Sequence, residues 1–144
     1  MNSDELKEII SSVKTGRVSV EAAVSKLKYL PYEDISFAKI DHHRHLRQGI
    51  PEVIFASGKT KKQIIAIAAS MHKKSGRFLI TRATEEIYKS LKIKEAVFHP
   101  SAGIISVGGE KKKEGSVLVI SAGTSDIPVA EEASVTASFL GSRV

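Results

Sequence analysis

The sequence predicts an α/β protein with an N-terminal helical hairpin, a small and mostly parallel α/β sheet domain, and the first strand, turn and helix of a doubly wound nucleotide-binding domain. Three observations predict this class. Apolar residues recur at helical spacing near the N-terminus, short apolar runs alternate with helical patterns after residue 52, and a continuous apolar run precedes a turn of small residues near the end.

The N-terminal hairpin is predicted from two short amphipathic patterns. In the first, Leu6, Ile10 and Val13 fall on one helical face, and Gly16 is placed to end the helix. Ser19 is placed to cap the second helix. A short glycine turn between two such helices is typical of a helical hairpin.

The sheet domain is predicted from four short apolar runs, at residues 52–56, 78–81, 96–99 and 104–107. Thr60 and Gln63 have the spacing of a capping box, so a helix should begin there, and Gly76 should end it. Thr84 is expected to cap a shorter helix. Because strands and helices alternate, the sheet is expected to be largely parallel. An extended segment is also expected to begin after residue 34.

The segment 108–115 (GGEKKKEG) is charged and has no apolar residue, so we interpret it as a linker whose lysines are solvated. The predicted domains are therefore a helical hairpin at 1–33, an α/β domain at 34–109, a linker at 110–115 and the start of a nucleotide-binding domain at 116–144.

Beyond this linker, residues 116–121 form a continuous apolar run, as expected of a strand buried on both faces of a parallel sheet. Pro128 suits the first turn of a helix that should run to about Leu140, with Gly141 ending it. Residues 142–144 would approach the next strand. A single strand and helix cannot complete a parallel sheet, so we expect the chain to be the N-terminal part of a longer protein.

The turn between this strand and helix is the strongest candidate site. Backbone N–H groups at a helix N-terminus suit a phosphate, and Gly123 allows close approach. The hydroxyls of Thr124 and Ser125 can donate to phosphate oxygens, and Asp126 can accept from a ribose hydroxyl. A plain helix cap by Ser125 or Asp126 explains the same residues equally well.

A second candidate is the segment 41–47 (DHHRHLR), with three histidines in four residues. Their spacing fits no common zinc pattern and no cysteine accompanies them, so we predict no metal site. Arg44 and Arg47 could instead form a guanidinium pair for an anion, with Asp41 orienting a histidine such as His42. A solvated polar loop is the alternative.

Arg82 is a minor candidate, because it follows a strand at the kind of sheet edge where α/β proteins bind ligands. His72 and His99 are interpreted as structural. No residue in the chain is assigned a catalytic role.

The composition limits the function classes. The net charge of +6, from 22 basic and 16 acidic residues, suits small anions and does not indicate a nucleic-acid binder. The chain has no cysteine, no apolar run near the ~20 residues of a membrane span and no signal-peptide pattern, so we expect a cytoplasmic protein without a membrane partner.

Three segments together resemble the LarB family: LKYLPYEDISFAKIDHHRHLRQGIPEVIFASGKT (Leu27–Thr60), ITRAT (Ile80–Thr84) and SAGTSDIPVAEEA (Ser121–Ala133). That family makes a precursor of the nickel-pincer nucleotide. Its C-terminal domain resembles PurE, the aminoimidazole ribonucleotide carboxylase/mutase. The resemblance covers nearly the whole chain and places its last 29 residues, 116–144, at the start of the PurE-like domain.

The resemblance implies a reaction. LarB-type enzymes carboxylate the pyridinium ring of nicotinic acid adenine dinucleotide and hydrolyse its phosphoanhydride, which yields pyridinium-3,5-biscarboxylic acid mononucleotide and AMP. It implies CO₂ or bicarbonate as co-substrate and no tightly bound cofactor, and it leaves a need for Mg²⁺ open. Residues 123–126 would hold the phosphoribosyl group of the dinucleotide.

The family uses a cysteine as covalent catalyst, which we expect beyond Val144, and it forms a homo-oligomer through the PurE-like domain. The chain by itself is therefore not expected to complete the reaction. Two alternatives stay open from the sequence: a nucleotide-binding or regulatory module without turnover, and a PurE-type activity on aminoimidazole ribonucleotide.

Overall fold

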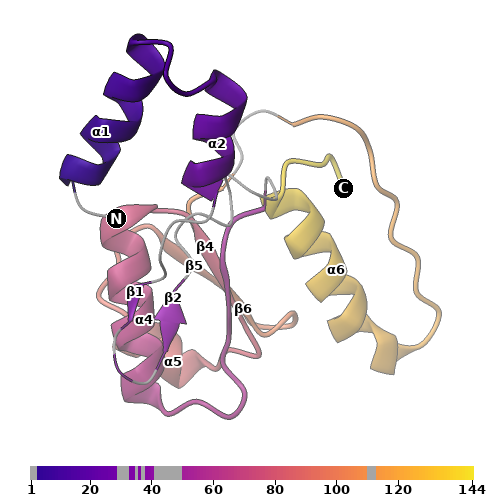
Figure 1. Ribbon diagram of the computed structural model, residues 1–144. Coiled ribbons are helices and arrows are strands. Elements are labelled where there is room, and N and C mark those ends of the chain that lie inside the picture. The colour runs from indigo at the N-terminus through magenta and orange to yellow at the C-terminus, as the bar shows by residue number, and fades with distance from the viewer. Residues whose placement is uncertain (1–2, 29–32, 35, 37, 41–49, 110–112) are drawn as a thin grey trace. The chain divides into compact units, whose positions relative to one another are not determined.

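The structure is a computed structural model that describes residues 3–28, 33–34, 36, 38–40, 50–109 and 113–144 (Figure 1). The chain divides into two compact units, Met1–Gly49 and Ile50–Val144. Among the described residues, no helix combines the length and apolar character needed to cross a lipid bilayer.

The first unit contains the predicted helical hairpin. Helices α1 (Ser3–Lys14) and α2 (Val20–Lys28) contact each other and are joined by a turn in which Gly16 has a φ of +72°. This left-handed conformation favours glycine, because it has no Cβ to clash with the backbone. The Ser19 hydroxyl accepts a hydrogen bond of 3.1 Å from Ala22 N, so the predicted cap of α2 is confirmed.

The extended segment expected after residue 34 is a hairpin instead. Strands β1 (Glu33–Asp34) and β2 (Lys39–Ile40) are two residues each and pair antiparallel. Ser36, between them, has a φ of 75°, which reverses the chain direction where the alternation of apolar residues suggested continuous strand.

The second unit is built on a four-stranded sheet with the order β3-β4-β6-β5. Its strands lie where the apolar runs predicted them: β3 (Val53–Phe55), β4 (Phe78–Thr81), β5 (Ala96–His99) and β6 (Ile104–Val107). The α4 helix (Lys61–Lys74) connects β3 to β4, and α5 (Glu85–Ser90) connects β4 to β5.

The prediction of a mostly parallel sheet is wrong, because β6 lies between two strands that run in its opposite direction. Only β3 and β4 pair parallel, whereas β6 pairs antiparallel with both β4 and β5. The helical crossovers do leave β3, β4 and β5 pointing the same way. The short turn between β5 and β6 is too brief for a crossover, so it forces a hairpin.

One face of the sheet is covered by α4 and α5. The ring of Phe98 on β5 stacks on Tyr88 of α5, with centroids 5.5 Å apart. Phe98 is paired with Ile105, and Ile105 with Ile80, so these side chains share that face. Ile80 and Ile105 are fully buried beneath the helices, and Phe98 is half-buried. Helix α4 contributes a stripe of buried residues: Ile64, Ile67, Ala68 and Met71.

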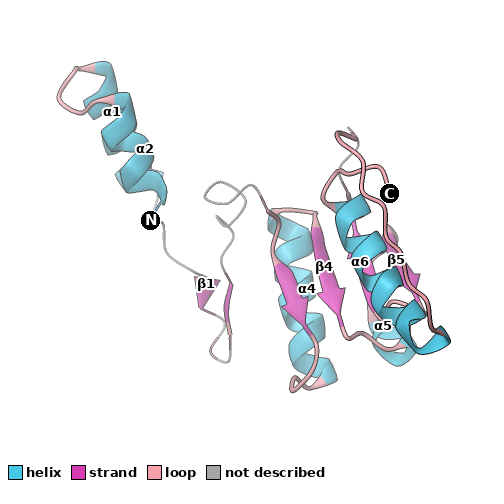
Figure 2. Ribbon diagram, turned by 90° about the vertical axis from the view of Figure 1, so that its right-hand side faces the viewer, coloured by secondary structure: helices cyan, strands magenta, loops and turns pink. Residues whose placement is uncertain are grey.

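Helix α6 (Ile127–Phe139) covers part of the opposite face (Figure 2). Phe139 is buried in a cluster with Leu79 of β4 and Ile104 of β6, and Val135 packs against this cluster. On the same face Phe55 of β3 and Val97 of β5 are exposed, so α6 covers the sheet only at its two central strands.

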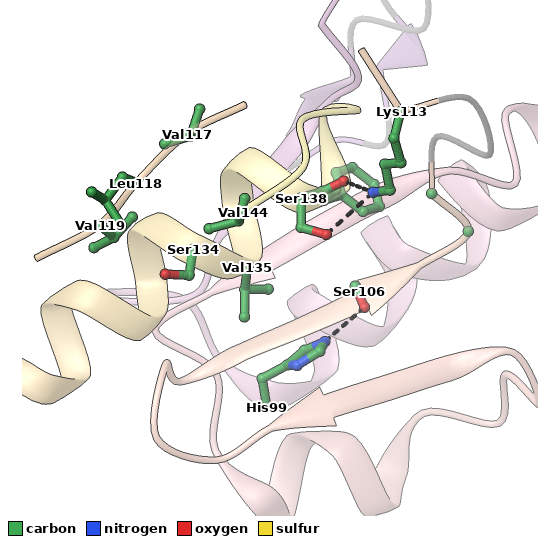
Figure 3. Close-up of a pocket in the computed structure, with 13 residues that line it drawn as sticks. His99, Ser106, Lys113, Val117, Leu118, Val119, Ser134, Val135, Ser138 and Val144 are labelled. Carbon is green, nitrogen blue, oxygen red and sulfur yellow. Dashed lines mark hydrogen bonds between the residues drawn. The ribbon is translucent and has the colours of Figure 1, made fainter. Parts of the chain in front are cut away.

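Two cations hold the C-terminal end of α6. The guanidinium of Arg77, at the start of β4, donates to the Phe139 carbonyl at 3.0 Å and lies 5.2 Å from the centre of the Phe139 ring. The ammonium of Lys113 donates to the carbonyl of Ser138 (Figure 3). Carbonyls of a last helical turn have no partner within the helix and carry partial negative charge, so both contacts stabilise this end.

Residues 116–121 are not the buried strand that the apolar run predicted. They form an extended segment with one parallel bridge, between Ser116 and Arg143, where Val117 N donates to the Arg143 carbonyl at 2.8 Å. Leu118 and Ile120 are 83% and 82% exposed. Among the described residues no second strand pairs along this segment, and its face at Leu118 and Ile120 is left uncovered.

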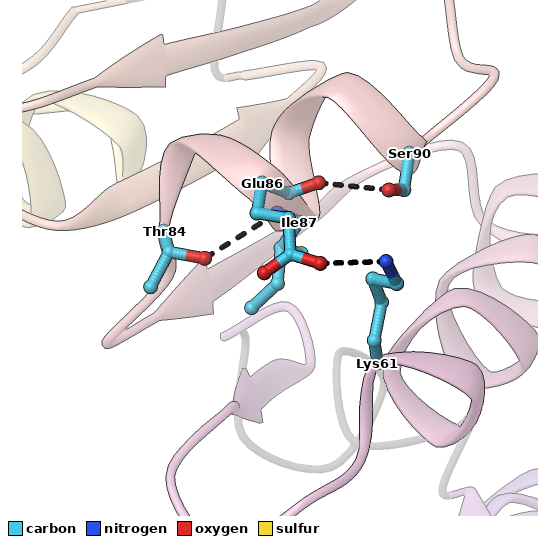
Figure 4. Close-up of polar contacts among 5 residues, drawn as sticks. All are labelled: Lys61, Thr84, Glu86, Ile87 and Ser90. Atoms are coloured by element: carbon cyan, nitrogen blue, oxygen red, sulfur yellow. Dashed lines mark hydrogen bonds and ion pairs between the residues drawn. The ribbon is translucent and has the colours of Figure 1, made fainter.

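The capping predictions for the sheet domain are confirmed. Thr60 and Gln63 form both hydrogen bonds of a capping box at the start of α4, at 3.3 and 2.9 Å. Thr84 accepts from Ile87 N at the start of α5. An ion pair of 2.6 Å between Lys61 and Glu86 then links the two helices (Figure 4).

The contrast between buried and exposed isoleucines gives a stability test. Ile105→Ala should lower the free energy of unfolding by about 3 kcal/mol, because it leaves a cavity at a fully buried position. The matched truncation Ile120→Ala, at an 82% exposed position, should change it by less than about 0.5 kcal/mol. Urea unfolding followed by circular dichroism measures both. Equal losses would show that residues 116–121 are buried in solution.

The Lys61–Glu86 pair gives a pH test. The hydrogen bond and positive charge of Lys61 lower the pKa of Glu86. The pair therefore stabilises the folded state above the unfolded pKa of Glu86, about 4.3, and this contribution is lost as pH falls through the lowered folded pKa. The effect should be small, because both side chains are exposed. Carbon-detected NMR titration should show the Glu86 pKa rising toward its ordinary value in Lys61→Met. An unchanged pKa would contradict the pair.

Candidate functional site

The predicted phosphate-binding turn lies at the exposed N-terminal end of α6. Thr124–Asp126 form a single turn of 3₁₀ helix that leads directly into α6, and Pro128 lies in the first turn of α6 as predicted. Every residue from Ser121 to Val129 is exposed. The end of α6 that carries partial positive charge is thus accessible to a ligand, although no wall of protein encloses it.

Asp126 is folded back over this turn. Its carboxylate oxygen Oδ2 accepts a hydrogen bond of 3.3 Å from Gly123 N, and its own N–H donates to the Gly123 carbonyl at 3.0 Å. Asp126 therefore closes the turn on itself, but its side chain makes no capping hydrogen bond to α6, so the helix cap predicted for Asp126 is not formed. In this arrangement its negative charge lies at the position that a phosphate would take, so phosphate binding requires the side chain to turn away.

The hydroxyls of Thr124 and Ser125 are free to bind a ligand. Neither has a hydrogen-bond partner in the part of the chain that the structure describes, and both are exposed. The turn therefore offers two hydroxyl donors next to the N-terminal end of a helix, which is the chemistry expected for recognition of an oxyanion.

Arg82 is not joined to this turn by any contact in the structure; its guanidinium pairs with Glu132 on α6 at 3.3 Å. Glu132 is six residues beyond Asp126, which corresponds to about 9 Å along the helix axis. Arg82 also has a φ of 55°, in the left-handed region where a side chain is strained. It occupies the sharp bend between β4 and the cap of α5.

The second candidate site cannot be placed against the first, because Asp41, His42, Arg44 and Arg47 lie outside the described residues. Among the residues that are described, no group of three or more histidine, aspartate or glutamate side chains is arranged to hold a metal ion. The anion-site hypothesis for this segment stays a prediction.

A groove that the sequence interpretation did not anticipate lies beside α6 (Figure 3). It has a volume of about 620 Å³ and is walled by α6, by the extended segment 117–119 and by the sheet at β5 and β6. His99 and Ser106 lie in it, with His99 Nε2 and Ser106 Oγ 3.0 Å apart. The residues of the phosphate turn do not line this groove.

The sequence pattern indicates other roles for two residues of the groove, Lys113 and His99. Lys113 was interpreted as part of a solvated linker; it is exposed, yet it reaches α6 and donates to both the carbonyl and the hydroxyl of Ser138. His99 was assigned to a strand end, and its partner Ser106 comes from the neighbouring strand. Strand pairing brings these two together, and no spacing in the sequence indicates it.

Comparison with known families gives a match over residues 32–111 to the family described as the LarB/PurE-like N-terminal domain. The match includes the segment 41–47 and the whole four-stranded sheet. It ends before the extended segment and the turn at 123–126.

The chain is also similar to a curated protein of Methanocaldococcus jannaschii, named only as the uncharacterized protein MJ0165. The two are 33% identical over 147 residues, which cover 94% of this chain and 57% of that protein. This chain thus spans a little over half the length of the curated relative it matches. The similarity extends beyond the sheet unit into regions that the family match does not reach.

The strained backbone of Arg82 gives a test that separates conformation from ion pairing. Arg82→Gly and Arg82→Ala both remove the pair with Glu132, but only glycine relaxes the positive φ. The glycine variant should therefore be more stable than the alanine variant by about 1 kcal/mol. At Lys94, which has no positive φ, the order should reverse. Thermal unfolding measures all four, and a less stable glycine variant at position 82 would contradict the strain.

Proposed function

Because the chain belongs to the family defined by the LarB/PurE-like N-terminal domain, we propose that it forms the N-terminal part of a LarB-type enzyme. In this proposal the whole enzyme carboxylates the pyridinium ring of nicotinic acid adenine dinucleotide and hydrolyses the phosphoanhydride. The products are pyridinium-3,5-biscarboxylic acid mononucleotide and AMP. The family match over residues 32–111 is the observation that carries the proposal.

The turn at the start of α6 supports a role in binding the nucleotide. Thr124 and Ser125 present free hydroxyls beside the positive end of a 13-residue helix. A phosphate seated there displaces the Asp126 carboxylate from Gly123 N. The released carboxylate can then accept from a ribose hydroxyl of the same nucleotide, which would hold the phosphoribosyl group at two points.

The chemical step itself is assigned to no residue of this chain. A pyridinium ring is poor in electrons, so it needs a nucleophile to add to it before a ring carbon can attack CO₂. The family resemblance implies a cysteine for this role, and the 144 residues contain none. The residues described above would bind and orient the substrate, while CO₂ or bicarbonate supplies the new carboxylate.

The proposal is tested on the longer relative from M. jannaschii and on this chain in parallel. Nicotinic acid adenine dinucleotide with bicarbonate, with and without Mg²⁺, should give a carboxylated mononucleotide and AMP when the relative is present, as detected by mass spectrometry. This chain alone should give neither product. Failure of the relative to form a carboxylated product under both conditions would contradict the proposal.

The same assay separates the two alternative functions. Carboxylation of aminoimidazole ribonucleotide by the relative, with no reaction of the dinucleotide, would indicate a PurE-type activity. Binding of the dinucleotide without any turnover would indicate a nucleotide-binding module.

The turn variants test the binding role in this chain. Thr124→Ala combined with Ser125→Ala should raise the dissociation constant for AMP about a hundredfold, because each of the two lost hydrogen bonds to a charged group contributes roughly 1.5 kcal/mol. The melting temperature should not change, since neither hydroxyl has a partner in the described structure. Calorimetry and thermal unfolding measure the two effects.

The exposed hydroxyl of Ser101 offers a matched control, and Ser101→Ala should leave AMP binding unchanged. The variant Asp126→Ala decides between closure of the turn and ligand contact. Lower stability with unchanged AMP binding would show that Asp126 only closes the turn.

A further inference from the structure

The groove beside α6 has the size and shape of a small-molecule site and lies apart from the proposed nucleotide turn. Its volume of about 620 Å³ falls within the range of about 300–1,000 Å³ that is usual for such sites. Three separate parts of the second unit form it: the sheet at β5 and β6, α6 and the segment 117–119. Figure 3 shows residues of all three on either side of α6.

Part of the lining of the groove is apolar, and polar side chains lie beside it. Val117 and Val119 come from the extended segment, Val135 and Phe139 from α6, and Val144 from the C-terminal residues. Water in contact with this surface is released when an apolar ligand covers it, which favours binding. The groove therefore suits a ligand with an apolar body.

The charge of the groove is positive. Among the described residues that line it, none is an aspartate or glutamate, whereas Lys113 contributes a full positive charge. Its ammonium has three donors, and Ser138 accepts two of them, at the carbonyl and at the hydroxyl. One N–H of Lys113 is therefore left for a ligand, with the apolar walls beside it.

His99 and Ser106 supply the other polar group of the groove, and Figure 3 shows them away from Lys113. A histidine and a serine paired through one ring nitrogen offer one donor or acceptor to a polar group of the ligand. Within the described lining a single lysine balances one negative charge, and a second charge beside the valine side chains would lie uncompensated. These features favour a monoanion over a phosphate dianion.

We propose that this groove binds a small organic monoanion with an apolar body, such as an aromatic carboxylate, whose carboxylate pairs with Lys113. This site is separate from the proposed nucleotide turn and does not depend on it. The helix α6 lies between them and contributes its N-terminal end to the turn and the flank at Ser134 and Ser138 to the groove.

Benzoate and benzamide are matched probes, because they share a ring and differ in charge. In a ¹⁵N NMR titration of the 144-residue chain, benzoate should shift the amides of Lys113, Val117, Ser134 and Ser138. Its dissociation constant should be at least fivefold lower than that of benzamide. The variant Lys113→Met should remove this preference, whereas Lys94→Met, at an exposed lysine outside the groove, should preserve it.

A second variant blocks the groove without changing its charge. The Ser134 hydroxyl only donates to the Ala130 carbonyl within its own helix, so Ser134→Trp should fill the groove and abolish the benzoate shifts. A dispersed spectrum shows that each variant is folded. Equal affinity of the two probes in the unmodified chain, or benzoate shifts that persist in Ser134→Trp, would overturn the proposal.

A titration with AMP tests the turn at residues 123–126 in the same way that benzoate tests the groove. Its shifts should centre on residues 123–126 and should survive Ser134→Trp. The groove proposal and the nucleotide proposal can therefore fail independently.

Discussion

The second unit depends on the contact between Arg77 and the last turn of α6. A helix that ends against a sheet leaves carbonyls without partners, and burying them would be costly unless donors reach them. Arg77 supplies a donor to the Phe139 carbonyl and also covers the Phe139 ring, while Lys113 supplies another to Ser138. These cations allow Phe139 to enter the apolar cluster with Leu79 and Ile104, and this cluster covers the two central strands on the second face of the sheet.

Because of these contacts, the C-terminal end of α6 is packed against the sheet and its N-terminal end is exposed. Its C-terminal turn is fixed by burial, cation–π contact and capping, whereas its N-terminal turn is exposed and is joined to the sheet unit through Arg82 and Glu132 farther along the helix. Both candidate sites follow from this arrangement. The nucleotide turn lies at the accessible positive end of the helix dipole, and the groove lies along the flank that the anchored half holds against the sheet.

The features that the sequence predicted correctly depend on neighbours in the chain. The capping boxes and glycine stops act within one helical turn, so Thr60, Gln63, Thr84 and Gly16 are read from spacing alone. Strand positions follow from short apolar runs. The order and direction of the strands depend on which runs meet in space, and the short turn between β5 and β6 sends β6 back between β4 and β5. The alternation of strands and helices along the sequence does not show that β6 lies between β4 and β5.

The sequence by itself determined the class of the protein, the positions of its main helices and sheet strands, its family and the position of the turn before α6, because each depends on residues close together in the chain. Tertiary structure decided that Asp126 covers Gly123 N, that Lys113 caps α6 and that His99 meets Ser106 in a groove. It also left Leu118 and Ile120 exposed where the apolar pattern indicated burial. An apolar run indicates that a segment is stable when buried. Burial of the segment as a strand also requires neighbouring strands that pair with it.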